Sequence, residues 1–144
     1  MLIFTCNHCP YVLGCDERLE RLIASLAGAD VRFVGICSND AQAYPQDSFQ
    51  RMAERAEHLP YLYLHDADQT VAKAYGAQLT PEFFVLEQSG EHRVLRWHGS
   101  IDDSPRHAEH HRCDYLRPAL RALLGGQPLT RAVSPIQGCS IKWL

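Results

Sequence analysis

The sequence has no long hydrophobic run, because its apolar stretches extend over only a few residues. A helix that crosses a bilayer needs about 20 consecutive apolar residues, so we expect no membrane-spanning segment and no membrane partner. Residues 1–4 carry no charged leader and precede no extended apolar stretch, so we expect no secretory signal peptide.

A basic run is also absent. Fourteen Lys and Arg residues stand against 17 Asp and Glu residues, which leaves a net charge of −3. A mildly acidic chain without a basic patch is a poor ligand for nucleic acid, so we expect no nucleic-acid partner.

Internal repeats and low-complexity linkers are lacking too. With 46% apolar residues over 144 positions, the chain is long enough for one buried core.

The six cysteines lack the spacing of a closed metal site or of a disulfide scaffold. They occupy positions 6, 9, 15, 37, 113 and 139. No second C-x-x-C accompanies the first pair, so we expect no structural zinc, no metal and no cofactor. One close pair with scattered thiols indicates a reducing compartment, and we expect a cytoplasmic location.

Hydrophobic patterning predicts an alternation of strands and helices. Short apolar runs predict strands at 1–5, 31–37, 61–64, 83–86 and 94–97. Apolar residues at helical spacing predict helices at 10–28, 49–56, 69–75 and 116–123. The order β-α-β-α-β-α-β-β-α predicts an α/β protein, because strand–helix–strand units form parallel sheets and a closing hairpin adds antiparallel strands. We expect the segment from Gln127 onward to be mostly irregular.

The motif Cys6-Asn7-His8-Cys9 lies between the first strand and the first helix. Unsatisfied N–H groups at a helix N-terminus stabilise a thiolate, so we expect the pKa of Cys6 to fall below the usual value of about 8.5. Cys9 lies one turn further on and can close a disulfide with Cys6. The two intervening residues are supporting candidates, since His8 can add charge or an N–H donor. The alternative is two buried cysteines with no chemistry.

Thr80-Pro81 precedes the strand at 83–86. An X-Pro bond adopts the cis form at modest cost, and a proline at the start of a strand costs one hydrogen bond of the ladder. Pro81 is therefore either a strand-starting residue or part of a site with the two cysteines.

These features together resemble the thioredoxin superfamily, in its peroxiredoxin-like branch of redoxin and AhpC/TSA-related proteins. The resemblance rests on the segment 4–12 around the Cys-Asn-His-Cys motif, on Thr80-Pro81, and on the tail motif Gly138-Cys139-Ser140-Ile141-Lys142-Trp143. It implies a thioredoxin-like three-layer α/β/α sandwich with a mixed central sheet, N-terminally short. Residues 1–126 would form the thioredoxin-like domain, and residues 127–144 a C-terminal extension that packs on it.

The resemblance also implies roles for site residues. Cys6 matches the nucleophilic cysteine and Cys9 the resolving cysteine of a thiol-disulfide oxidoreductase. Pro81 matches the cis-proline, next to which the Thr80 backbone would bind a substrate chain by strand addition. Protein or small-molecule disulfides and thiols are the expected substrates. The alternatives are a peroxiredoxin-like thiol peroxidase, and a Cu(I)-binding or Cu(I)-delivery module that uses the thiolates and His8.

Other candidates keep two interpretations each. Cys139 is either a third redox thiol or part of a structural tail anchored by Trp143. Cys37 ends a strand and is expected to be a buried small residue, with a redox role as the alternative, while Cys15 and Cys113 are expected to be bystanders on helices. We expect a solvated cluster at His107, His110 and His111, with metal binding as the alternative. We expect caps at Asp40, Asp66 and Asp68, with a proton relay as the alternative.

The first strand begins at Met1, and related proteins carry a further segment before it. We therefore expect an apolar sheet surface that is covered by a partner subunit in a homodimer or by the C-terminal tail.

Overall fold

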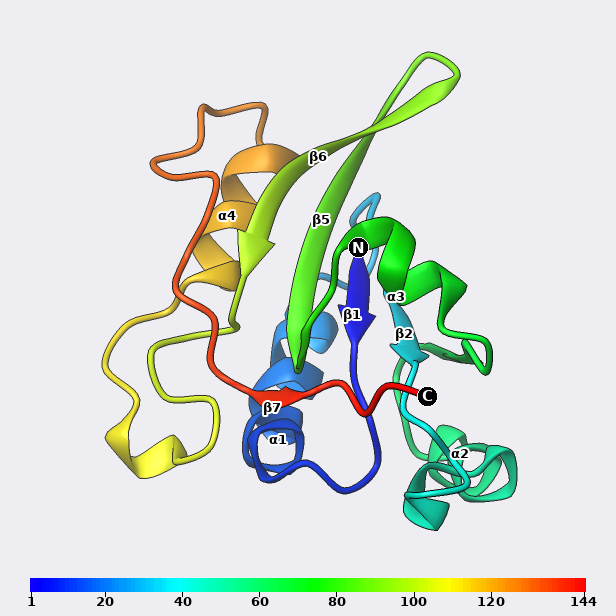
Figure 1. Ribbon diagram of the computed structural model, residues 1–144. Coiled ribbons are helices and arrows are strands. Elements are labelled where there is room, and N and C mark those ends of the chain that lie inside the picture. Colours follow the sequence, from blue (N-terminus) through cyan, green and yellow to red (C-terminus); the bar gives the residue numbers. More distant parts are fainter.

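The computed structural model describes residues 1–144 and contains a five-stranded mixed sheet in the order β3-β2-β1-β5-β6 (Figure 1). The central strand β1 pairs in parallel with β2, which pairs in parallel with β3. On its other side β1 pairs antiparallel with β5, and β5 with β6. The strands are β1 (Leu2–Phe4), β2 (Val34–Cys37), β3 (Leu62–His65), β5 (Glu82–Ser89) and β6 (His92–Gly99). The mixed sheet closed by a hairpin confirms the α/β prediction.

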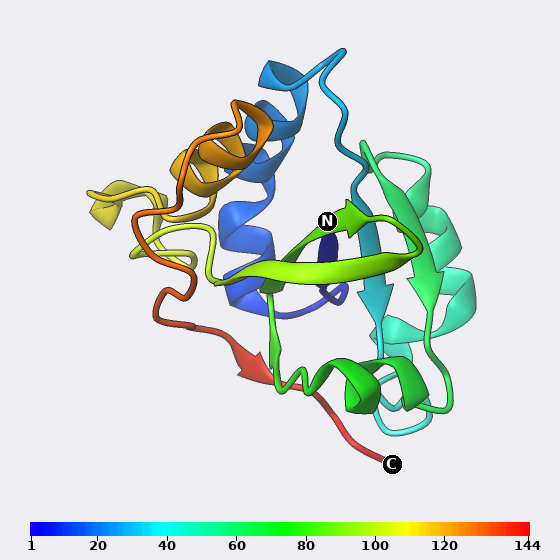
Figure 2. The same ribbon diagram turned by 90° about the horizontal axis from the view of Figure 1, so that it is seen from above.

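Helices cover both faces of this sheet (Figure 2). α1 and α4 lie together on one face, and α3 lies on the other. α2 flanks the edge strand β3 and is tied to α1 by an ion pair of 2.7 Å between Arg55 and Asp16. The helices are α1 (Pro10–Ser25), α2 (Phe49–Ala56), α3 (Thr70–Tyr75) and α4 (Leu116–Leu124), with short 3₁₀ turns η1 (Pro45–Asp47) and η2 (Ala108–His110). This is the expected three-layer α/β/α arrangement.

The core lies on both faces of the sheet because successive strand residues point to opposite sides. Ile3 and Phe83 pack under α1 and α4 together with Trp97. Their neighbours Phe4 and Phe84 face α3. Burying each such large side chain contributes roughly 1.5–3 kcal/mol, so these two layers fix where the loops after β1 and β2 lie.

Several boundaries differ from the sequence prediction. The first helix ends at Ser25 rather than at Gly28, which lies beyond it with φ = +81°. The second strand begins at Val34 rather than at residue 31. Cys113 lies in the loop between η2 and α4, not on a helix, because the periodic stripe that starts α4 begins only at Leu116.

The segment from Gln127 onward is more ordered than expected. It forms a short strand β7 (Cys139–Ser140) that pairs antiparallel with β4 (Leu79–Thr80) in a second, two-stranded sheet. Figure 1 shows β7, in red, running past the N-terminal end of β5 beside α1. A two-residue strand has no periodicity, so sequence patterning does not reveal it. Ile141, which follows β7, is 2% exposed and joins the cluster on the α3 face.

A groove of about 700 Å³ remains beside β1 and is lined mostly by apolar side chains. It lies between β1, the outer half of β5 and the end of α4, and no residue after Leu124 lines it. The segment 127–144 therefore does not cover this surface, and a partner subunit there stays a prediction. No helix of the chain combines the length and apolar character that a bilayer crossing demands.

Candidate active site at the Cys-x-x-Cys pair

Cys6 and Cys9 lie where β1 leads into α1, at the carboxyl ends of the parallel strands. Cys9 is the N-cap residue of α1, and Pro10 is its first residue. Proline suits this position because the first N–H groups of a helix have no intrahelical partner. The structure thus corrects the sequence expectation: the helix N-terminus lies at Cys9, whereas Cys6 lies one turn earlier, in the connecting loop.

The two thiols are buried against the residue that precedes Pro81. Cys6 is 1% exposed and Cys9 0%. The Cys9 thiol donates to the carbonyl oxygen of Thr80 at 3.1 Å, and Cys6 Sγ lies 3.5 Å from Thr80 Oγ1. The Thr80–Pro81 peptide bond is cis. Thr80 therefore contacts both sulfurs, one through its backbone and the other through its side chain.

Hydrogen-bond donors gather on Cys9. Its pKa is lowered below the ordinary 9.0, first by a hydrogen bond from Cys6, with further donors in the Cys139 thiol and the backbone N–H groups of Val12 and Cys139. Burial and the facing Thr80 carbonyl act in the opposite direction, but the donors outnumber them. The pKa of Cys6 is raised by its hydrogen bond with Cys9, by burial and by the charge of Asp47. The hydrogen-bond donors therefore favour a thiolate on Cys9 over one on Cys6.

Asp47 is a site residue that sequence inspection missed. Its carboxylate is 0% exposed and accepts hydrogen bonds from the Asn7 N–H and from Asn39 Nδ2, both at 2.7 Å. His8 Nδ1 lies 2.8 Å from its second oxygen. Asp47 thus holds the two residues between the cysteines. The only sequence signal is Pro45, which starts the 3₁₀ turn that carries it.

Asn7 and His8 have further partners. Asn7 accepts a hydrogen bond from Tyr63 Oη at 3.0 Å and donates to the Gln46 carbonyl at 2.8 Å. The His8 ring stacks on Tyr44 with centroids 5.6 Å apart. Ligand atoms of Cys6, His8 and Asp47 lie within 4.8 Å of one another, a set whose sulfur and imidazole suit a soft metal ion such as Cu(I).

The remaining cysteines divide by position. Cys139 is partly buried and packs against the cluster that contains Cys6 and Cys9. Cys37, at the end of β2, is 0% exposed and packs in the same cluster, and burial raises its pKa to about 12. Cys15 is buried on α1, whereas Cys113 is exposed. The structure thus brings Cys139 and Cys37 to the pair and leaves Cys113 outside it.

The loop aspartates serve as caps, as predicted. Asp66 accepts the backbone N–H groups of Val71 and Ala72 in the first turn of α3, and a hydroxyl from Ser38 at 2.7 Å. Asp68 accepts from Thr70. Asp40 binds the N–H groups of the turn that follows it.

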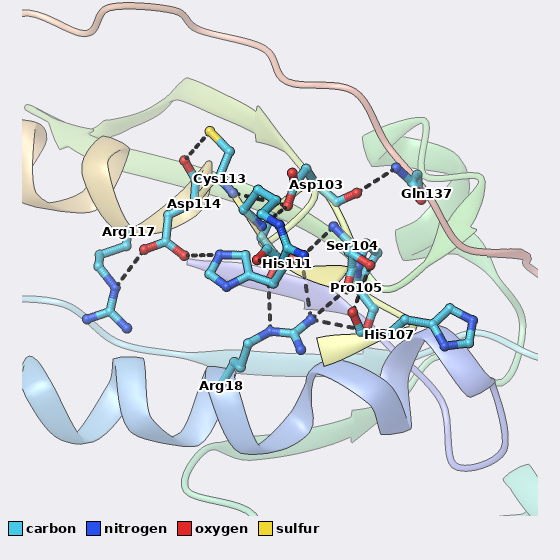
Figure 3. A network of polar contacts seen from close by, with 12 residues as sticks. Arg18, Asp103, Ser104, Pro105, His107, His111, Cys113, Asp114, Arg117 and Gln137 are labelled. Atoms are coloured by element: carbon cyan, nitrogen blue, oxygen red, sulfur yellow. Dashed lines mark hydrogen bonds and ion pairs between the residues drawn. The ribbon is translucent and has the colours of Figure 1, made fainter. Parts of the chain in front are cut away.

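A second polar cluster ties the segment 102–117 to α1 (Figure 3). Arg18 donates to Asp102 at 2.7 Å and to the Ser104 carbonyl at 2.8 Å. His111 Nε2 lies 3.0 Å from the Asp114 carboxylate. His107 and His110 are exposed, on and beside η2. None of these contacts involves a cysteine of the pair, and the Arg18 contacts hold the loop against α1.

Comparison with known proteins places the chain in a family and finds similar structures over nearly its whole length. The family model described as Redoxin matches residues 1–106. A hypothetical protein from Sinorhizobium meliloti is similar at 38% identity and a TM-score of 0.87, over 99% of this chain and 78% of that chain. An uncharacterized conserved protein from Geobacillus kaustophilus is similar at 39% identity and a TM-score of 0.87, over 99% of this chain and 76% of that chain.

No curated protein matches the chain. The structural likeness over nearly the whole chain confirms the thioredoxin-like fold. The family match covers both cysteines of the pair and the Thr80-Pro81 segment, and it indicates a thioredoxin-like redox function. The chain belongs to the Redoxin family.

Proposed function

We propose that this protein is a thiol-disulfide oxidoreductase whose working groups are the thiols of Cys6 and Cys9. The observation that carries the proposal is the packing of these two buried thiols against each other and against Thr80 at the N-terminus of α1. A thiolate is the attacking species in disulfide exchange, and a neighbouring thiol is what closes the cycle.

The reaction runs in two exchanges. The Cys9 thiolate attacks one sulfur of a substrate disulfide, so that a mixed disulfide forms and the other substrate sulfur leaves as a thiolate. Cys6 then attacks Cys9 Sγ, the Cys6–Cys9 disulfide forms, and the substrate leaves reduced, with the proton of Cys6. Two electrons pass from the pair to the substrate.

This assignment reverses the roles implied by the family resemblance, in which Cys6 attacks and Cys9 resolves. The reason is electrostatic, because Cys9 has the helix N-terminus and the backbone donors. Cys6 has Asp47 nearby, whose negative charge disfavours a second thiolate.

A peroxide is the second candidate substrate, favoured by the burial of both sulfurs, since a small oxidant reaches a buried sulfur more readily than a large disulfide does. The Cys9 thiolate would attack the peroxide oxygen and become a sulfenic acid, with water or an alcohol as the leaving group. Cys6 would then condense with it to the same disulfide and release water.

The test compares the wild type with Cys6→Ser, Cys9→Ser and Cys113→Ser. Each is treated with a model disulfide or with hydrogen peroxide, quenched with acid, alkylated and mapped by mass spectrometry. We expect the wild type and Cys113→Ser to form a Cys6–Cys9 disulfide. Cys6→Ser should form no Cys6–Cys9 disulfide but should still react first at Cys9, as a mixed disulfide or a sulfenic acid, and Cys9→Ser should be inactive.

The oxidant that forms the Cys6–Cys9 disulfide faster identifies the substrate class. The proposal fails if the wild type forms no Cys6–Cys9 disulfide with either oxidant. It also fails if Cys6→Ser and Cys9→Ser both consume the oxidant at the wild-type rate.

A further inference from the structure

The strand β7 occupies the edge beside Thr80 where an extended substrate chain would pair. Thr80 is the register partner of Cys139, and Leu79 that of Ser140, in the antiparallel β4–β7 ladder. Gly138 makes this approach feasible, because a Cβ there would lie 2.5 Å from the Thr80 carbonyl oxygen. The Gly-Cys sequence therefore brings the tail into contact with the residue that both site sulfurs touch.

The tail is held on both sides of β7. Before the strand, the Gln137 N–H donates to Ser100 Oγ at 2.9 Å. After it, the Ile141 N–H donates to the Gln78 carbonyl, and the Lys142 N–H to Asn39 Oδ1, each at 2.8 Å. These bonds keep the thiol of Cys139 in a defined position rather than on a mobile end.

The three thiols form a series from the interior to the surface. Cys9 and Cys6 pack together in one cluster, Cys139 packs against that cluster, and all three residues contact or pair with Thr80. Cys6 and Cys9 are at most 1% exposed, whereas Cys139 is partly exposed and most of its surroundings are open. A protein or peptide thiol that approaches from solvent therefore meets Cys139 before it meets the pair.

We propose that Cys139 is the third redox thiol of the site and that it carries the disulfide of the buried pair to an external thiol reductant. The inference rests on the proposed function, since it needs a Cys6–Cys9 disulfide as its starting point. The Cys139 thiolate attacks Cys9 Sγ, the Cys9–Cys139 bond forms and the Cys6–Cys9 bond breaks. Cys6 leaves as a thiolate and takes the proton that Cys139 gave up, so this step is an exchange without net oxidation.

Reduction then takes place at the accessible sulfur. An external thiolate attacks Cys139 Sγ and Cys9 leaves as a thiolate. A second external thiol attacks the resulting mixed disulfide, which frees Cys139 and yields the external disulfide. Two electrons enter the protein from two thiols. Thiolates of low pKa are the better leaving groups, so the donors around Cys9 direct the attack to Cys139.

Charge favours this order of steps. In the dithiol state the pKa of Cys139 is raised by partial burial and by its hydrogen bond and charge interaction with Cys9. Once Cys9 is part of a disulfide, that negative charge is gone, while Lys142 and Arg106 still favour a thiolate on Cys139. Cys139 is thus activated when the pair is oxidised.

The first experiment uses Cys6→Ser, which leaves Cys9 and Cys139 as the neighbouring thiols. After treatment with oxidised glutathione and acid quenching, peptide mapping should find a Cys9–Cys139 disulfide as the main product. Cys6→Ser/Cys113→Ser is the matched control and should give the same product. Cys6→Ser/Cys139→Ser should retain glutathione on Cys9. Retention of glutathione on Cys9 in Cys6→Ser itself would overturn the proposal.

The second experiment measures how fast reduced glutathione reduces the pre-formed Cys6–Cys9 disulfide. Starting from the pre-formed disulfide in each protein, we expect Cys139→Ser to be reduced about tenfold more slowly than the wild type or Cys113→Ser, because the accessible sulfur is missing. Gly138→Ala, which keeps all six thiols, should also be slow because its Cβ pushes β7 away from Thr80.

Equal reduction rates in the wild type, Cys139→Ser and Gly138→Ala would refute the relay and leave the proposed function intact. Absence of the Cys6–Cys9 disulfide in the wild type would instead refute the proposed function, so the two failures differ in their readout.

Discussion

Thr80 and Cys139 are register partners in the short β4–β7 ladder, although they lie far apart in the chain. The same Thr80 carbonyl accepts the hydrogen bond of the Cys9 thiol at 3.1 Å. One backbone unit thus orients a sulfur of the buried pair and aligns the tail cysteine beside it. The C-terminal segment therefore lies beside the candidate site and places a third thiol next to the pair.

The thiolate of Cys9 should depend on Cys6. Replacing Cys6 by Ala removes the hydrogen bond that contributes most to the lowered pKa of Cys9, so this pKa should rise. Cys6→Ser should raise it less, because a hydroxyl also donates. The pH dependence of Cys9 alkylation, followed by peptide mass spectrometry, measures both shifts. Superimposable titration curves for the wild type and Cys6→Ala would contradict this electrostatic coupling.

The free energy of unfolding of the reduced protein should depend on pH because of the ionisation of Cys9. Its pKa is lower in the folded state than the ordinary 9.0, so between these two values the unfolded chain binds more protons. The free energy of unfolding should therefore rise with pH in this window and fall as the solution is acidified. Cys9→Ser should flatten that slope. Urea unfolding under reducing conditions, in acidic and in neutral buffer, tests the difference between the two slopes.

Asp47→Asn should lower the stability of the fold and lower the pKa of Cys6. An amide offers one acceptor oxygen to the two donors, Asn7 N–H and Asn39 Nδ2, so one buried donor loses its partner at a cost of about 1–3 kcal/mol. The pKa of Cys6 should fall, since the charge of Asp47 raises it. Urea unfolding and thiol titration measure the two effects. Asp30→Asn, at an exposed position, is the control and should change neither.

Ile141→Ala should loosen the tail. Ile141 is 2% exposed and packs in the cluster that contains Phe4, Ile36 and Phe84. Truncating a buried isoleucine costs about 2–5 kcal/mol, and loss of this anchor should speed alkylation of Cys139. Leu144→Ala, at a position 73% exposed, is the matched control. Unchanged Cys139 alkylation in Ile141→Ala would show that β7 pairing alone holds the tail.

Arg18→Ala should destabilise the loop that follows β6. Asp102 is 1% exposed, and removal of Arg18 leaves its carboxylate buried without its cation, at a cost of about 3–5 kcal/mol. Arg21→Ala breaks only an exposed pair with Glu17 and should change stability by less than about 1 kcal/mol. Thermal unfolding of the two variants distinguishes a structural network from surface charge. Equal stabilities would show that the Arg18 contacts contribute nothing.

The fold class followed from local patterning. Apolar runs and helical stripes depend on neighbours a few residues away, so they predicted the strand and helix order and the Cys6–Cys9 pair at the first strand–helix junction. The position of the helix start did not follow. Pro10 fits the first turn, and this shifts the N-cap to Cys9 and moves the stabilised thiolate away from the residue that the sequence favoured.

Contacts between distant segments could be decided only by the tertiary structure. Asp47 lies in a three-residue turn with no motif of its own, yet packing places its carboxylate under the loop between the cysteines. Cys139 belongs to a two-residue strand, too short for a period, and only the β4 edge and the buried Ile141 bring it to Cys9. The sequence by itself determined which elements form and where the reactive pair lies, because those are local properties. Packing decided which thiol holds the charge and which thiol lies next to it, because both depend on groups that meet only in the folded chain.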